Sequence, residues 1–406
     1  MVDAATGART EHALPAEKPA TEPATAWAMV HGRGNAGLDS YEALCSNAIV
    51  APPQSARWIR AWVGETNPDY LIASLRLDGA TLYALPLEIV VEGGLKVARY
   101  MGGSHANGNF APASPAWLAS ADTADLRALT SAIRKARPDI DILRLERQAI
   151  DLHGFRNPLL LLPHVRSPNI ALAADLSGGF DALLERASGK RKRKKNRSQQ
   201  RKFAEAGGFE MVRASTPEEV EDLLTAFFLL KHRRFESQGI EDVFADPATR
   251  NFLTRLFTEA LGDENVPFRL DALRVGGIIR AVAGTSVSGN TLTCDFVTIR
   301  EDELSQASPG EFLFFETIRR ACEEGFEVFD FSVGDERYKR EWCDRERTQF
   351  DTLYPLTRRG RIAALRMSAI GKAKGFVKNN SVLWPLVVRL RRGLAGARTP
   401  ASRDPV

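Results

Sequence analysis

The segment from Thr291 to Glu324 constrains the fold more than any other part of the chain. An apolar strand, Thr291–Ile299, leads into a polar loop and then into a helix that opens with Ser308, Pro309 and Gly310. We expect Ser308 to cap this helix, Pro309 to fill its first turn and Gly310 to let a ligand approach the backbone. A helix N-terminus after a strand presents N–H groups and a positive dipole end to phosphate. The pattern predicts a phosphate-binding loop, with a purely structural joint as the alternative.

A second unusual feature follows this helix. After Gly325, which is typical of a helix end, the strand Glu327–Phe331 places Asp330 on the face opposite to its two aromatic neighbours. An acid in that position is unusual because aspartate is disfavoured in strands. A short polar loop comes next and carries Asp335, Tyr338 and Lys339. Groups that can exchange protons or bind anions are thus concentrated here.

The predicted elements occur twice in the same order. The first set is a helix, three strands, a helix and a strand, at Ser55–Trp62, Tyr70–Leu77, Thr81–Val91, Leu95–Met101, Asp122–Arg137 and Ile140–Leu145. The second set has longer helices, at Phe180–Ala206, Pro217–Phe235, Pro247–Leu261, Phe268–Arg274, Ile278–Val287, Thr291–Ile299, Pro309–Glu324, Glu327–Phe331 and Phe350–Leu356. This order predicts an α+β (mixed α/β) fold with an internal duplication, in which each half is a mostly antiparallel sheet flanked by helices.

Composition changes along the chain suggest four segments. Residues 1–26 are rich in Ala, Pro, Thr and Glu and are expected to form a disordered tail. Residues 27–165 and 166–357 would form the two folded domains. Residues 358–406 form a basic tail in which apolar residues alternate with Lys and Arg.

The run SPGEFLFFETIRRACEEGFEVFDFSVGDERYKREW, from Ser308 to Trp342, resembles the GNAT-like acetyltransferases of the cellulose-biosynthesis CelD type. These are similar in fold to the FemABX peptidyltransferases, and the resemblance extends from about Leu38 to Leu356. It implies a tandem GNAT fold, an acyltransferase activity and a role in exopolysaccharide or cell-envelope biosynthesis. It also implies acetyl-CoA or another acyl-CoA as donor. FemABX proteins use aminoacyl-tRNA instead, so the donor stays open, as does the choice between an amine and a hydroxyl acceptor.

The resemblance also implies roles for individual residues. The donor would contact the end of a strand and the start of the next helix, at Val297, Thr298, Ser308, Pro309 and Gly310. The proline is a departure, because the GNAT pyrophosphate loop has its first glycine at that position. Asp330 would act as base or orient the acceptor, Tyr338 would protonate the leaving thiolate, and Lys339 would bind an oxygen atom with Asp335 orienting it. No Ser-His-Asp or Cys-His grouping is evident, which favours direct transfer.

A strongly basic stretch runs from Lys190 to Lys202 without an acidic residue. Like charges spaced four apart destabilise a helix, so this stretch predicts a counter-ion: an anionic acceptor, an anionic membrane or nucleic acid. Nucleic acid is disfavoured because no aromatic residue for base stacking occurs before Phe203. The predicted substrate-binding residues are Arg193, Arg197 and Arg201. The basic tail after residue 358 predicts an amphipathic element on a membrane surface.

Metal and disulfide chemistry are not predicted. The four cysteines lack CxxC spacing and the six histidines form no HxH or HExxH pair, which argues against a zinc site or a disulfide framework. No apolar run has the length of a membrane span. We therefore expect a cytoplasmic protein, with peripheral membrane contact as a further hypothesis. The alternative to an acyltransferase is a catalytically silent GNAT-like scaffold that attaches to a membrane or a polysaccharide-synthesis complex through its basic surfaces.

Overall fold

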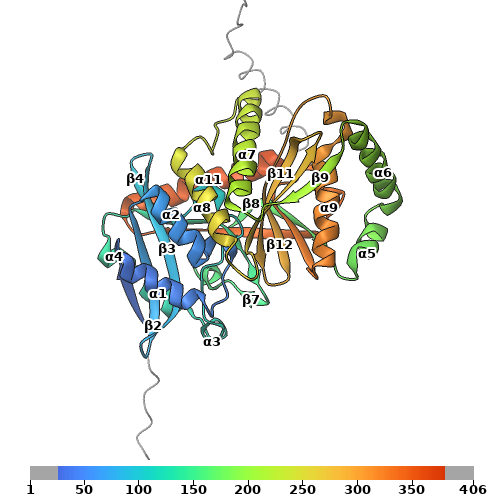
Figure 1. The fold of residues 1–406 in the computed structure, drawn as a ribbon. Coiled ribbons are helices and arrows are strands. Elements are labelled where there is room, and N and C mark those ends of the chain that lie inside the picture. The colour runs from blue at the N-terminus through green and yellow to red at the C-terminus, as the bar shows by residue number, and fades with distance from the viewer. Residues whose placement is uncertain (1–25, 380–406) are drawn as a thin grey trace, which may run out of the picture.

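A single twelve-stranded sheet runs through the protein in the computed structural model, which describes residues 26–379 (Figure 1). The strand order is β1-β2-β3-β4-β5-β14-β8-β13-β12-β11-β10-β9. The predicted tail 1–26 and the end of the basic tail, from residue 380, lie almost wholly outside the described residues.

The first half of the chain supplies the strands at one end of the sheet. Its elements are β1 (Trp27–His31), α1 (Asn35–Cys45), α2 (Ala56–Thr66), β2 (Tyr70–Leu77), β3 (Ala80–Glu92), β4 (Leu95–Tyr100), α3 (Pro115–Leu118), α4 (Thr123–Ala136), β5 (Ile142–Ala149), the small hairpin β6 (Asp151–Leu152) and β7 (Phe155–Arg156), and β8 (His164–Asp175).

The second half supplies the other end and the long helices. Its elements are α5 (Gly179–Arg186), α6 (Gly189–Glu205), β9 (Phe209–Arg213), α7 (Pro217–Gln238), α8 (Pro247–Ala260), β10 (Phe268–Val275), β11 (Ile278–Ser288), β12 (Thr291–Ile299), α9 (Pro309–Glu323), β13 (Val328–Val333), α10 (Arg337–Arg340), β14 (Arg345–Pro355) and α11 (Arg358–Asn379).

The predicted duplication is visible in the topology. In the first half, β2, β3 and β4 form an antiparallel meander, and α4 then crosses over so that β5 lies parallel to β4. In the second half, β10, β11 and β12 form the meander, and α9 carries the chain to β13, which lies parallel to β12. A parallel neighbour requires such a crossover, whereas antiparallel neighbours need only a tight turn.

Two strands join the halves into one sheet. β14 comes from the end of the second half but pairs with β5 on one side and β8 on the other. The predicted boundary between residues 165 and 166 lies inside β8. Helices α2 and α8 also pack together beside the sheet (Figure 1). The rings of Trp58 and Trp62 on α2 contact the ring of Phe252 on α8 edge-on, with 4.9 and 5.0 Å between ring centres. These contacts hold the faces of the two halves together.

Most of the predicted elements are observed, but several observed ones, including β1, α1, β8 and β9, are absent from the predicted set. Strand β14 begins five residues before the predicted strand. The predicted helix 180–206 is two helices, because Ser188 adopts a left-handed conformation with φ of 58° between α5 and α6. The predicted cap of α7 is confirmed: the Thr216 hydroxyl accepts a hydrogen bond from the N–H of Glu219, and Pro217 begins the helix.

Candidate active site

Two adjoining cavities lie between the halves. The first, of about 360 Å³, is lined by β8, β11, β12, β13 and β14 together with the Asn107–Gly108 loop of the first half. We call it the polar cavity after its hydroxyl, carboxylate and guanidinium side chains, which stand among several apolar ones. The second, of about 260 Å³, is apolar and lies among Trp58, Phe244 and Phe257. Asn107 and Asp295 line both cavities, so Asp295 stands at their junction.

A β-bulge places Asp295 at this junction. On β11, Thr285 pairs with Cys294 and Gly284 pairs with Phe296, which leaves Asp295 as the extra residue of β12. A bulge re-aims the side chain that it carries, and bulges are frequent next to active sites. The Asp295 carboxylate accepts a hydrogen bond from the Ser286 hydroxyl at 3.2 Å. Burial, and the nearby charge of a second carboxylate, raise the pKa of Asp295 to about 7.

That second carboxylate is Asp330, which the sequence pattern predicts as a site residue. Its two oxygens accept hydrogen bonds from the N–H of Ser332 at 2.7 Å and from the Arg347 guanidinium at 3.2 Å. Burial raises the pKa of Asp330, while Arg347, the Ser332 N–H and Lys339 act in the opposite direction. Asp330 therefore has two strong stabilisers of its charge, whereas Asp295 has one hydroxyl. The surroundings favour the charged form of Asp330 more than that of Asp295. Two carboxyl groups with different protonation preferences are the pattern expected of an acid–base pair.

Both carboxylates lie where β12 and β13 stop pairing. The two strands are paired over only three residues each, ending at Thr293 and Asp330, although both strands continue beyond that point. Ser332 has a positive φ of 59°, and the register between β13 and β8 shifts between Asp330 and Val333. Beyond this point β12 and β13 are no longer paired with each other beside the polar cavity.

The predicted loop 335–339 divides between the two faces of β13. Lys339 is buried, and its ammonium group donates to the carbonyl of Val333 at 2.8 Å and pairs with Glu336 at 3.0 Å. Asp335 pairs with Arg340 at 2.5 Å, so the observed contacts that orient Lys339 come from Val333 and Glu336. The expected orientation of Lys339 by Asp335 stays a prediction.

Tyr338 lies on the face opposite to Asp330. Its ring stacks on Phe314 with 5.5 Å between ring centres, and it also contacts Phe331. Burial among these rings raises the pKa of Tyr338. The structure thus brings Lys339 near Asp330 but separates Tyr338 from it by the width of one strand.

The predicted phosphate-binding loop is held in place by hydrogen bonds from α6. Ser308 adopts a left-handed conformation with φ of 56°, and its side chain makes no capping hydrogen bond. Its carbonyl accepts from the side chain of Gln199, as does that of Ala307. A β-carbon on Gly310 would stand 2.6 Å from Ile299, so this glycine is required by packing. The expectation of a Ser308 cap is therefore corrected, whereas the approach of a ligand to the backbone at Gly310 stays a prediction.

The other predicted donor-binding residues are also engaged within the fold. Pro309 is buried at the start of α9. Val297 and Thr298 pair with Ala283 and Val282 of β11, and Thr298 is fully buried. Their proposed contact with a donor stays a prediction.

Helix α6 has two different faces. Arg193, Arg197 and Arg201, the predicted substrate-binding residues, are all exposed, and Arg193 pairs with Asp181 at 2.6 Å. The opposite face is buried against α9 and its preceding loop, where Asn196 donates to Glu316 at 3.0 Å. The sequence signal for this buried face is a helical spacing of uncharged residues within the basic run, at Asn196, Gln199 and Phe203.

The described residues hold neither a metal cluster nor a membrane span. Within residues 26–379, no three His, Cys, Asp or Glu side chains gather closely enough to hold a metal ion. Over the same range, no helix combines the length and the apolar character needed to cross a bilayer.

Comparison with known families agrees with this arrangement. Residues 190–340 match the family profile described as an acetyltransferase (GNAT) domain. This part of the chain is a GNAT acetyltransferase domain. It contains α6, the β10–β13 sheet, α9, Asp295 and Asp330, and the protein is accordingly an acyltransferase. The GNAT fold implies an acyl-CoA donor.

Solved structures support the fold over a longer span. The crystal structure of FemX is similar over 80% of this chain and 96% of its own, with a TM-score of 0.55 and 12% identity. A conserved protein of unknown function from Bacteroides thetaiotaomicron is similar over 80% of this chain and 100% of its own, with a TM-score of 0.52 and 13% identity. A comparison with curated proteins gave no match. The predicted α+β fold with two GNAT-like halves is confirmed.

The β-bulge gives a stability prediction. A β-carbon on Gly284 would overlap the ring of Phe296, the residue that follows Asp295. We expect Gly284→Ala to destabilise the protein by about 1–3 kcal/mol through overpacking. The double variant Gly284→Ala/Phe296→Leu should recover most of the loss in urea unfolding, because the smaller side chain leaves room for the methyl group. An equal loss in the single and double variants would contradict this origin of the strain.

Proposed function

We propose that the protein transfers an acyl group, in the first instance acetyl, from acyl-CoA to an amine or hydroxyl of an acceptor bound in the polar cavity between the halves. The observation that carries the proposal is the pair Asp295 and Asp330 at the point where β12 and β13 separate. A carboxylate whose pKa is about 7 is suited to proton abstraction at neutral pH.

The proposed reaction is a direct transfer. Asp295 takes the proton of the acceptor N–H or O–H as the acceptor atom attacks the thioester carbonyl carbon. The carbon–oxygen double bond opens to an oxyanion, and its collapse breaks the carbon–sulfur bond and releases the CoA thiolate. A proton then returns to the sulfur. Asp330, held by Arg347, orients the acceptor, and neighbouring N–H groups of the separated strands stabilise the oxyanion.

Lys339 and Tyr338 take supporting roles in this proposal. Lys339 lies close enough to Asp330 to favour its charged form. Tyr338 and Phe314 form a stacked pair on the opposite face of β13. We propose that a thioester passes between the separated strands with its sulfur toward Tyr338, whose hydroxyl then donates a proton to the thiolate.

The lining of the polar cavity supports a polyhydroxylated acceptor. Six hydroxyl side chains line it, namely Ser286, Ser288, Thr291, Thr293, Ser332 and Thr348. Hydroxyls can both donate and accept hydrogen bonds, which suits the alternating donors and acceptors of a sugar. Together with the CelD-type resemblance, this supports a saccharide or cell-envelope precursor as acceptor and a role in exopolysaccharide or envelope biosynthesis.

Calorimetry with acetyl-CoA tests the donor, and release of free thiol in the presence of amino sugars and neutral sugars tests the reaction. We expect acetyl-CoA to bind the full chain and an acceptor to accelerate thiol release. Acetyl-CoA with the enzyme and without an acceptor is the matched control for hydrolysis. The absence of any binding heat at high protein concentration would overturn acyl-CoA as the donor.

A further inference from the structure

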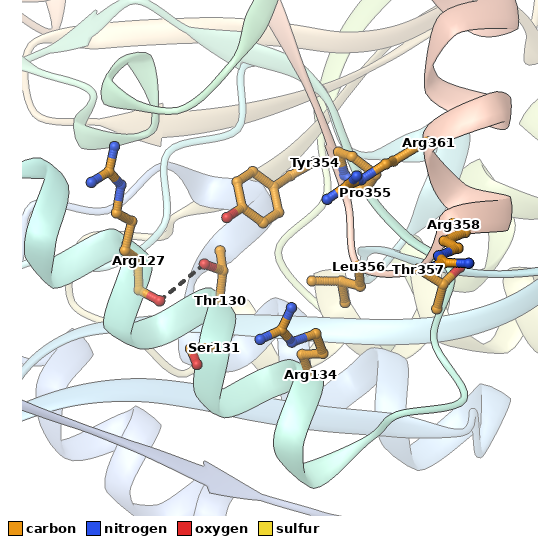
Figure 2. Close-up of a pocket in the computed structure, with 10 residues that line it drawn as sticks. All are labelled: Arg127, Thr130, Ser131, Arg134, Tyr354, Pro355, Leu356, Thr357, Arg358 and Arg361. Atoms are coloured by element: carbon orange, nitrogen blue, oxygen red, sulfur yellow. Dashed lines mark hydrogen bonds between the residues drawn. The ribbon is translucent and has the colours of Figure 1, made fainter.

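A basic cavity lies apart from the candidate active site. It has a volume of about 430 Å³ and stands between α4 and the junction of β14 with α11 (Figure 2). Arg127 and Arg134 enter from α4, and Arg358 and Arg361 enter from the first turn of α11. The cavity shares no lining residue with either cavity of the active site, and its lining includes no carboxylate.

The four arginines stand without counter-charges in the part of the chain that the structure describes. None of the four is in an ion pair there, and all are exposed. Nearby arginines behave differently: Arg137 pairs with Asp69 at 2.8 Å, and Arg144 pairs with Glu92 at 2.6 Å. A concentration of positive charge in a concave surface attracts anions. Guanidinium groups bind phosphate with two parallel hydrogen bonds, so phosphate is the anion that this cavity fits best.

Helix α11 adds an apolar face beside the cavity. Ile362 and Leu365 are 56% and 73% exposed, and helical spacing places them in one stripe with Arg358. Arg361 and Arg366 stand on the two sides of that stripe. Exposed aliphatic side chains flanked by arginines are typical of helices that lie in a membrane interface. A small soluble phosphate ligand would not require this apolar stripe, so the combination favours a lipid surface.

We propose that the basic cavity and the outward face of α11 form a docking surface for a bilayer containing anionic phospholipids. The headgroup phosphates enter the cavity between Arg127, Arg134 and Arg358, while Ile362 and Leu365 enter the interface. The sequence pattern suggested membrane contact for the basic tail and for the basic stretch of α6, but not for α4. The structure adds two arginines from α4, more than 200 residues earlier in the chain. The proposed surface is therefore formed jointly by α4 and α11 in the folded protein. The proposal does not depend on the acyl-transfer chemistry.

Vesicle sedimentation of the full chain tests the proposal. The wild type should bind vesicles of phosphatidylcholine mixed with phosphatidylglycerol and should not bind phosphatidylcholine alone. Arg127→Gln/Arg134→Gln should weaken partitioning about thirtyfold, since each surface arginine contributes a factor of about five to binding an anionic leaflet. The matched control is Arg197→Gln/Arg201→Gln, which removes the same charge from exposed positions of α6 and should leave partitioning near the wild-type value. Leu365→Ser should weaken partitioning without changing the charge.

Three outcomes would overturn the proposal. If the wild type does not bind the anionic vesicles, the proposal is wrong. Equal losses in the α4 and α6 variants would assign binding to net charge rather than to this cavity. Calorimetric binding of inorganic pyrophosphate that depends on Arg127 and Arg134, without vesicle binding, would assign the cavity to a soluble phosphate ligand. Unfolding curves of each variant confirm that the folded state is retained.

Discussion

Asp295→Asn is expected to lower kcat at neutral pH by about 10²–10⁴, which is the usual contribution of a general base. Asparagine keeps the shape of the side chain and its hydrogen bond with Ser286, but it cannot accept a proton. The binding of acetyl-CoA should change little, because the substitution removes proton transfer and leaves the donor contacts in place. Initial rates and calorimetry on the same preparation separate the two effects.

The pH dependence provides a second measurement of the same group. With a pKa of about 7, Asp295 becomes an effective base as the pH rises through neutrality, so kcat/KM should rise with pH and level off above about pH 8. Asp330→Asn removes the neighbouring negative charge, which should shift the rising limb to lower pH. The control is Asp151→Asn, at an exposed carboxylate on the rim of the same cavity, which should leave the profile unchanged.

The same raised pKa has a consequence for stability. The carboxyl of Asp295 holds its proton more tightly in the folded state than in the unfolded chain, where the pKa is about 4. Folding stability is therefore lost as the pH rises between those two values, because ionisation favours the unfolded chain. Asp295→Asn should be more stable than the wild type at pH 8 and similar to it at pH 4. A variant that keeps full activity, or one that loses stability at pH 8, would contradict the assignment of Asp295.

The local sequence predicts the fold well where helices and strands carry their own signals. The helix caps at Thr216 and Asp246 and the alternating apolar residues of β10–β12 are of this kind. Strand β8 is different, because its sequence HVRSPNIALAAD contains a proline and three alanines, none of which favours a strand. It is a strand because β13 and β14 pair with it on both sides. Such pairing joins residues far apart in the chain and leaves no local signal.

The residues of the candidate site likewise divide into those with a local sequence signal and those without one. Asp330 is predictable because an acid between aromatic residues in a strand is unusual. The same reasoning applies to Asp295, which stands between Cys294 and Phe296 in the middle of a strand. Arg347 has no such signal, since its contact with Asp330 depends on the position of β14 in the sheet. The hydrogen bond from Gln199 to the loop also depends on how α6 packs on α9, which the basic composition of that helix conceals.

The second large effect is expected at Asp271 on β10, where substitution by alanine should destabilise the protein by about 3 kcal/mol. Asp271 is 1% exposed and accepts hydrogen bonds from Arg213 of β9 at 2.9 Å and from Arg320 of α9 at 3.0 Å. Its removal leaves two guanidinium groups around an empty position with no buried acid to balance them. The loss is a large part of the roughly 5–15 kcal/mol that stabilises a typical domain. Urea unfolding followed by circular dichroism measures it.

Asp222→Ala is the matched control for this effect. Asp222 also forms an ion pair with an arginine, Arg274 of β10, but its side chain is 55% exposed. An exposed pair contributes at most about 1 kcal/mol, because water already solvates both charges. A similar loss in both variants would mean that burial of Asp271 adds nothing. A loss confined to Asp271→Ala would show that this carboxylate fastens α9 to the sheet, and with it the loop and the separated strands that hold Asp295 and Asp330.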